Sequence, residues 1–309
     1  MSAKLTNHFS RWRLCLPALL LAGTGGFANA EPIYVSDTGD GSVKVFDQYS
    51  GAYMGTWGTG FLALPMGLAI DGQNNLFVAD YSRGEVFRFN DQTGAYEGQF
   101  GGGFLADPYG LAVDANDVVY VANPGGDNVE RFNGLTGAYL GDIAAGYAGL
   151  PLGVALDARG NLYLSDHSNG KVFRFNSQTG AYEGYLASGF AGSPFGVSVD
   201  SKGVLDVYDG ANNQVLKFNA SNGGYMGSMG QGFATLGYGV AADQNGVEYL
   251  ADHNGNVVDR FNNETGAYMG QIGAGILINP TFVAVVPEPA AFTLFIAGSL
   301  ALFARRRNR

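Results

Sequence analysis

The chain repeats itself every 43 residues. The segment QTGAYEG occurs at residues 92–98 and again, unchanged, at residues 178–184. A tyrosine recurs at this interval, at Tyr53, Tyr96, Tyr139, Tyr182, Tyr225 and Tyr268. A phenylalanine does the same, at Phe46, Phe89, Phe132, Phe175, Phe218 and Phe261. The sequence therefore contains six copies of one structural unit, with no insertion or deletion between them.

One copy, residues 108–150, indicates what the unit is. It reads PYGLAVDANDVVYVANPGGDNVERFNGLTGAYLGDIAAGYAGL and contains four segments typical of short strands: GLAVD, VVYVAN, NVERFN and GAYLGDIA. Asn-x-x-Thr-Gly separates the third segment from the fourth, and its glycine can take the left-handed conformation that closes a hairpin. Four antiparallel strands in 43 residues predict one blade of a β-propeller.

The two ends of the repeat region complete each other. Residues from Pro32 begin with PIYVSD, a second-strand sequence without a first strand before it. Residues 281–286 read TFVAVV, a first-strand sequence with nothing after it. An open array would need polar capping repeats, and neither end has one. We therefore predict an all-β, six-bladed propeller over residues 31–286, closed by the C-terminal strand joining the N-terminal blade.

Two segments carry a resemblance to a known family. GNLYLSDHSNGKVFRFN and LPMGLAIDGQNNLFVADYSRGEVFRFN resemble NHL repeats: Pro-x-Gly, a short apolar strand ending in Asp, a Tyr-Val-Ala-Asp-like strand, and an Arg-Phe pair. The resemblance covers residues 31–286 and implies a six-bladed propeller. It does not imply one activity, because that group includes lyases, lactonases and binding modules.

The first 30 residues have the pattern of a secretory signal peptide. Lys4, Arg11 and Arg13 precede an apolar run from Leu14 to Ala22, and Ala28-Asn29-Ala30 is a small-x-small cleavage pattern. A retained membrane anchor is the alternative, but the run is shorter than the roughly 20 residues that a span needs. The only cysteine, Cys15, lies inside this segment. The mature protein is thus expected to contain neither a thiol nor a disulfide.

Residues 287–309 resemble a PEP-CTERM sorting signal. Pro287, Glu288 and Pro289 precede an apolar segment, residues 290–304, which is predicted to form a helix. The chain then ends in an arginine cluster containing Arg305, Arg306, Arg307 and Arg309. The resemblance implies a Gram-negative bacterium, transient inner-membrane insertion, processing by an exosortase-type enzyme, and release to the cell surface or extracellular matrix. A simple C-terminal anchor is the alternative.

Charge limits the class of partner. Of the 27 acidic and 17 basic residues, one acidic and seven basic residues lie in the two terminal segments. Residues 31–286 therefore carry a net charge of −16. A surface this acidic repels nucleic acid and anionic lipid, and suits solubility or contact with cations or neutral polymers.

The centre of the predicted ring offers an apolar mouth rather than catalytic groups. The cores of the first strands, such as Leu111-Ala112-Val113, contain no acid, amide or histidine, whereas a lactonase-like metal site needs carboxylates there. The variable residue of Pro-x-Gly lies at the channel mouth. It could form a partly exposed ligand-binding ring or pack against neighbouring blades. These candidate residues are Met66, Tyr109, Leu152, Phe195, Tyr238 and Thr281.

Three further sets of polar residues occupy equivalent positions in different copies of the repeat. The ends of the second strands are expected to accept backbone hydrogen bonds from the following turn: Asp37, Asp80, Asn123, Asp166, Asp209 and Asp252. A basic residue beside the third-strand phenylalanine is expected to pair with carboxylates; the set is Arg88, Arg131, Arg174, Lys217 and Arg260, with Val45 in the first blade. His167 and His253 occupy equivalent positions two blades apart, roughly 17 Å from each other by strand spacing. We interpret them as solvated loop residues and predict no metal site.

Two functional hypotheses follow. The first is a non-enzymatic, exported binding or scaffold protein that requires no cofactor, with exopolysaccharide or another surface protein as partner. It rests on the near-equivalent blades, because one substrate usually needs different groups from different blades. The alternative is a lyase or lactonase dependent on a divalent metal held by loop carboxylates such as Asp37 or Asp80. No nucleophile–histidine pair or phosphate loop is present in the sequence.

Overall fold

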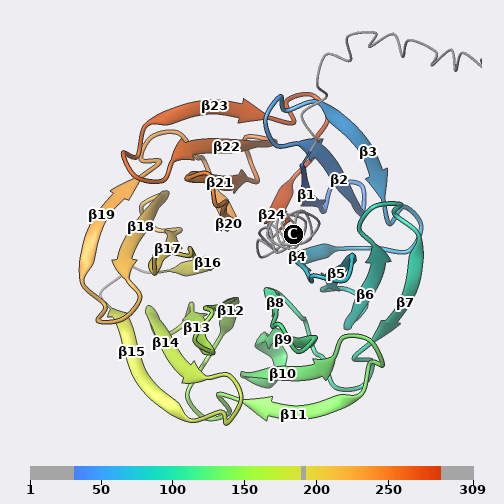
Figure 1. Ribbon diagram of the computed structural model, residues 1–309, viewed down its shortest axis with the longest axis vertical. Coiled ribbons are helices and arrows are strands. Elements are labelled where there is room, and N and C mark those ends of the chain that lie inside the picture. Colours follow the sequence, from blue (N-terminus) through green and yellow to red (C-terminus); the bar gives the residue numbers. More distant parts are fainter. Residues whose placement is uncertain (1–30, 189–192, 287–309) are drawn as a thin grey trace, which may run out of the picture. The chain divides into compact units, whose positions relative to one another are not determined.

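The computed structural model describes residues 31–188 and 193–286, which form a ring of six four-stranded antiparallel sheets (Figure 1). Blade 1 combines both ends of this region and consists of β24 (Pro280–Val285), β1 (Pro32–Asp37), β2 (Ser42–Asp47) and β3 (Tyr53–Trp57). In each blade the first strand named lies nearest the centre, and the last lies on the outside of the ring. The predicted fold class is confirmed.

Blades 2 to 6 follow chain order. Blade 2 consists of β4 (Pro65–Ile70), β5 (Asn75–Asp80), β6 (Glu85–Asn90) and β7 (Tyr96–Phe100). Blade 3 consists of β8 (Leu111–Val113), β9 (Val118–Asn123), β10 (Asn128–Asn133) and β11 (Tyr139–Ile143), with one 3-10 turn, η1 (Pro124–Gly126). Blade 4 consists of β12 (Pro151–Leu156), β13 (Asn161–Asp166), β14 (Lys171–Asn176) and β15 (Tyr182–Ser188). Blade 5 consists of β16 (Pro194–Val199), β17 (Val204–Asp209), β18 (Gln214–Asn219) and β19 (Tyr225–Met229). Blade 6 consists of β20 (Gly237–Ala242), β21 (Val247–Asp252), β22 (Val257–Asn262) and β23 (Tyr268–Ile272).

The ring closes as the sequence predicts. β24 pairs antiparallel with β1, and Ile33 lies opposite Val285 while Val35 lies opposite Val283. Closure gives the inner edge of β1 a hydrogen-bonded partner, so blade 1 has the same four strands as the other blades.

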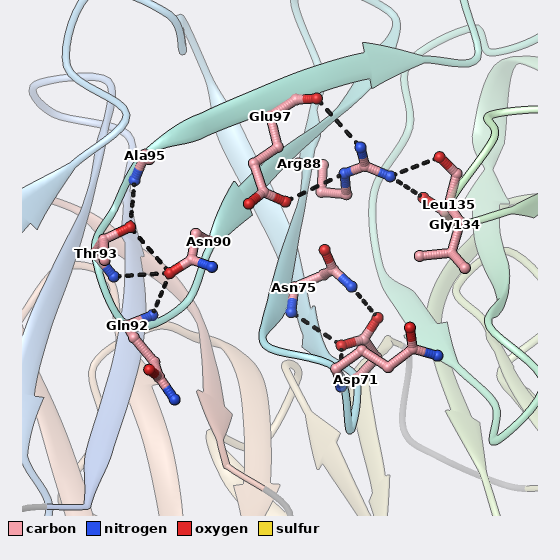
Figure 2. Close-up of polar contacts among 11 residues, drawn as sticks. Asp71, Asn75, Arg88, Asn90, Gln92, Thr93, Ala95, Glu97, Gly134 and Leu135 are labelled. Carbon is pink, nitrogen blue, oxygen red and sulfur yellow. Dashed lines mark hydrogen bonds and ion pairs between the residues drawn. The ribbon is translucent and has the colours of Figure 1, made fainter.

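The repeated hairpin explains the recurring letters of the 43-residue unit (Figure 2). In blade 2, Asn90 Oδ1 accepts hydrogen bonds from the amides of Gln92 (3.2 Å) and Thr93 (3.0 Å) and from the Thr93 hydroxyl (2.9 Å). Gly94 follows with φ +71°, a conformation that glycine adopts without steric cost. A Cβ atom there would also lie 2.5 Å from the Trp57 ring. The turn chemistry therefore fixes where the third strand ends and the fourth begins.

Adjacent blades pack through their second strands. Tyr163 of blade 4 and Leu205 of blade 5 belong to one buried cluster, and Tyr249 of blade 6 and Ile33 of blade 1 belong to another. Each pair joins an aromatic residue of one second strand to an aliphatic residue of the next. Burial of these side chains supplies the apolar contact that holds neighbouring blades together.

The glycine of Pro-x-Gly is required by the close approach of first strands near the centre. The amide of Gly110 donates to Leu152 O at 2.8 Å, and a Cβ atom on Gly110 would lie 2.5 Å from that oxygen. The same contact recurs at the next blade but one, where a Cβ atom on Gly196 would lie 2.4 Å from Tyr238 O. Any side chain at these positions would push two strands apart.

The predicted secretory signal (residues 1–30) and sorting segment (residues 287–309) lie outside the described residues. Within residues 31–188 and 193–286, no helix is long and apolar enough to cross a membrane.

Candidate functional site

The channel mouth is largely packed. Four of its six candidate residues are at most 8% exposed: Met66, Tyr109, Leu152 and Thr281. Phe195 and Tyr238 are half-buried and pack against the same cluster. The expected partly exposed ring is therefore limited to these two neighbouring aromatic residues. Met66, Tyr109 and Leu152 pack in one buried cluster. Thr281 hydrogen-bonds to the Ser36 hydroxyl and to Pro65 O.

Both histidines lie beside this exposed part of the mouth. The His167 ring meets Phe195 edge-on at a centroid distance of 4.8 Å, and the His253 ring meets Tyr238 at 5.0 Å. The ring centroids of Phe195 and Tyr238 are 5.2 Å apart. The interpretation as solvated loop histidines is wrong, because both are half-buried. Burial lowers the pKa of His167 and of His253 below the ordinary value, so both imidazoles are neutral at pH 7.

The carboxylates at the second-strand ends hold loops. Asp80 accepts the amide of Arg83 in the following turn at 3.1 Å, as predicted, and also the amide of Ala63 in the preceding inter-blade loop at 2.6 Å. Asp166 likewise accepts amides from Ser168 and Gly149. Each of these two carboxylates thus holds two loops together. Among the described residues, no group of three or more His, Cys, Asp or Glu side chains is placed to hold a metal ion.

The recurring basic residues act mainly between blades. Three of the five form ion pairs: Arg88 with Glu97 (3.6 Å), Arg174 with Glu183 (3.0 Å) and Lys217 with Asp206 (3.1 Å). All five donate to a backbone carbonyl of the following blade; the acceptors are Gly134 and Leu135 for Arg88, Gln178 for Arg131, Ser221 for Arg174, Asn263 for Lys217 and Gln48 for Arg260. Figure 2 shows the fork of Arg88. The prediction of carboxylate pairing is therefore incomplete, since it missed the shared contact.

A set of aromatic pairs lies on the outside of the ring, and the sequence interpretation missed it. The tyrosine that begins an outermost strand stacks on an aromatic residue from the loop leaving the preceding blade. The pairs are Phe61–Tyr96 (4.4 Å), Phe104–Tyr139 (4.1 Å), Tyr147–Tyr182 (4.6 Å) and Phe233–Tyr268 (4.3 Å), with ring planes within 27° of parallel. These eight residues are 38–48% exposed. We call them the rim pairs.

The signal for the rim pairs was present in the sequence. Aromatic residues recur at the loop position with the 43-residue period, at Phe61, Phe104, Tyr147, Phe190 and Phe233, and Ile276 takes this position in the sixth copy. Phe190 lies outside the described residues. Period alone could not reveal that each loop ring meets a tyrosine of the next blade, because this depends on how adjacent sheets twist relative to each other.

Two polar grooves open between neighbouring blades. One, of about 550 Å³, lies between blades 5 and 6 and is lined by Asp200, Lys202, Lys217, Asp243 and Asn263 among others. The second, of about 540 Å³, lies one blade earlier and is lined by Asp157, Tyr163 and Arg174. Their linings combine turns at the end of the ring opposite the mouth with residues of the adjoining strands.

Comparisons with known proteins support the fold. No family model matches the chain, and no curated protein matches it. Among solved structures, it is similar to a chain in the crystal structure of a nidogen/laminin complex, with a TM-score of 0.74 and 17% sequence identity. The match covers 82% of this chain and 97% of that one. At this identity the likeness concerns the propeller fold alone.

Proposed function

We propose that this protein is an exported binding or scaffold propeller of the cell surface or extracellular matrix, and that it binds a neutral, repeating glycan through its rim pairs. The observation that carries the proposal is the recurrence of exposed, stacked aromatic pairs in four described positions around the ring. Aromatic faces suit the apolar faces of sugar rings. Equivalent sites on equivalent blades suit a polymer of equivalent units, because several weak contacts add up when they are linked.

Charge supports a neutral partner over an anionic one. The net charge of −16 over residues 31–286 repels polymers of like sign. The outermost strands also carry exposed apolar side chains next to their first tyrosine; these are Met54, Leu140, Met226 and Met269. A neutral glycan can cover such a surface without desolvating charges.

Export belongs to the same proposal. The secretory signal pattern and the PEP-CTERM-like terminus support export and sorting by an exosortase-type enzyme in a Gram-negative bacterium. Intact masses of the protein from medium and membrane fractions test this step. The released protein is expected to lack residues 1–30 and the residues that follow a cleavage near Pro287–Pro289. A released full-length chain would contradict the proposed sorting.

The binding proposal is tested by affinity electrophoresis in gels that contain dextran, mannan, a cellulose ether or anionic alginate. A variant with Phe61→Ile, Phe104→Ile and Phe233→Ile removes three loop rings yet keeps an aliphatic residue, as Ile276 provides naturally. If each ring contributes about 0.5–1.5 kcal/mol, binding to a neutral glycan should weaken at least tenfold. Leu135→Ala, at an exposed hairpin turn, is the matched control.

Two outcomes would reject the glycan. Retardation of both proteins to the same extent would show that the rim pairs do not bind it. Retardation by alginate alone would show that the partner is an anionic polymer.

We put forward no metal-dependent activity, because the carboxylates that it would use accept loop amides, as Asp80 and Asp166 do.

A further inference from the structure

Three polar residues at the seam between blades 5 and 6 replace residues that are apolar in the other copies. Ser198 replaces an alanine, which the other five copies have at Ala69, Ala112, Ala155, Ala241 and Ala284. Asp206 replaces the aromatic residue found at Tyr34, Phe77, Tyr120, Tyr163 and Tyr249. Glu248 replaces the aliphatic residue found at Ile33, Leu76, Val119, Leu162 and Leu205. Elsewhere these last two positions form the aromatic–aliphatic contact between second strands, so both halves of one contact have changed together.

The replaced residues are buried and lie on facing strands. Ser198, Asp206 and Lys217 are cross-strand neighbours on β16, β17 and β18. Glu248 comes from β21 of the next blade, and Ser198 Oγ donates to Glu248 Oε1 at 3.4 Å. Both carboxylates are 0% exposed. A seam that is apolar elsewhere in the ring therefore holds two acidic groups with no access to water.

The contacts leave one charge unbalanced. Lys217 Nζ lies 3.1 Å from Asp206 Oδ1 and also donates to the backbone oxygen of Asn263 at 2.7 Å and to its side-chain oxygen. Apart from the ion pair of Oδ1 with Lys217, neither carboxylate oxygen of Asp206 has a hydrogen-bond partner among the described residues, and Glu248 Oε2 has none either. Two carboxylates and one ammonium group would leave a net charge of −1 in a dry interface, which is strongly unfavourable.

We propose that Glu248 holds a proton at neutral pH and donates it from Oε2 to the free oxygen of Asp206, so that blades 5 and 6 are joined by a pH-sensitive contact. One proton balances the charge and pairs Glu248 Oε2 with Asp206 Oδ2, while Asp206 Oδ1 keeps its ion pair with Lys217. Burial and the nearby Asp206 carboxylate raise the pKa of Glu248, and Asp200 acts in the same direction, while Lys217 and the Ser198 hydroxyl oppose them. Burial also raises the pKa of Asp206.

The sign of the pH effect follows from the raised pKa. The unfolded chain releases the Glu248 proton near its ordinary pKa of 4.5, whereas the folded chain retains it to higher pH. The stability that this proton contributes is therefore complete below pH 4.5 and is lost as the pH rises toward the pKa of the folded state. Lys217 forms an ion pair with Asp206 and also lines the groove between the two blades.

The experiment compares the wild type with Glu248→Gln by equilibrium denaturation between pH 5 and 9. The introduced amide is a neutral donor at every pH tested. Only the wild type should therefore show the pH dependence of stability that comes from the Glu248 proton. Relative to this variant, the wild-type unfolding constant should rise about tenfold per pH unit until the folded pKa is reached. Glu97→Gln, at an exposed surface residue of blade 2, is the control and should follow the wild type. If the free energies of unfolding of the wild type and of Glu248→Gln changed in parallel with pH, the proposal would be overturned.

Two further measurements keep the test decisive. If Glu248→Gln does not fold, the number of protons that the wild type releases on unfolding at pH 7 gives the same information. The reference for that measurement is a Glu248→Leu, Asp206→Tyr double variant, which restores the repeat residues at both positions. Release that is no greater from the wild type than from this variant would contradict the proposal. A pH dependence abolished by EDTA and restored by CaCl₂ would show that a cation, not a proton, balances the charge, and would likewise overturn it.

Discussion

The amide of Ile278 donates a 2.8 Å hydrogen bond to Oδ2 of Asp37, which joins the last inter-blade loop to the end of the first described strand. The two residues are 241 positions apart in the sequence. The same carboxylate accepts the amide of Gly39 at 3.1 Å. One buried side chain therefore fixes the loop that leads into β24, the strand that closes the ring.

Replacing Asp37 tests this closure contact. Asp37→Ala removes the acceptor for two amides in a fully buried position, and the free energy of unfolding should fall by about 2–4 kcal/mol. Asp37→Asn keeps an acceptor oxygen, as Asn123 does in blade 3, and should cost less than half as much. Urea denaturation measures both. Equal losses would indicate that charge rather than hydrogen bonding matters at this position.

The Pro-x-Gly glycines give a steric prediction. Gly110→Ala places a Cβ atom 2.5 Å from Leu152 O, so neighbouring first strands must separate, and we expect a loss of about 2–5 kcal/mol. Gly72→Ala has no atom within 4 Å of the added methyl and serves as control, with an expected change below about 0.5 kcal/mol. Thermal unfolding of the two variants distinguishes them, and a Gly110→Ala protein as stable as the control would contradict the close approach.

The repeated hairpin predicts a local effect. Asn90→Ala removes the acceptor of three hydrogen bonds in an exposed turn, so the expected loss is modest, about 0.5–2 kcal/mol. Amide hydrogen exchange should quicken in residues 90–96 and remain unchanged in residues 133–139, the same turn one blade on. Faster exchange across both blades would show that the hairpin controls the whole ring instead.

A second buried acid predicts a pH dependence in blade 6. Burial, with a contribution from Asp252, raises the pKa of Asp259 from 3.8 to about 6. Its protonation therefore favours the folded state below pH 3.8, and this stability is lost as the pH rises to about 6. Asp259→Asn should be more stable than the wild type at pH 8, by about 1–3 kcal/mol, and nearly equal to it at pH 3.5. Calorimetry at the two pH values checks this, and a constant difference would refute it.

The repeat itself determined the fold. Strand order, the hairpin turn and the closing strand follow from alternation, from Asn-x-x-Thr-Gly and from the split first blade, and these are relations within 43 residues or between equivalent copies. The loop-holding role of residues such as Asp80 was equally readable, because a strand-end carboxylate beside a turn acts locally. The position of the two histidines in equivalent copies was visible as well, although their burial was not.

Contacts between blades were decided by the tertiary structure. Four of the six mouth residues are buried, and Arg88 reaches the carbonyls of Gly134 and Leu135. Ser198, the cross-strand neighbour of Asp206, donates to Glu248 of the next copy. Such contacts join unlike positions of neighbouring repeats, and the match depends on the twist between sheets and on how closely six strands converge at the centre. Periodicity shows which residues are equivalent. It cannot show which residues meet, because meeting depends on the geometry between two blades rather than on the pattern inside one.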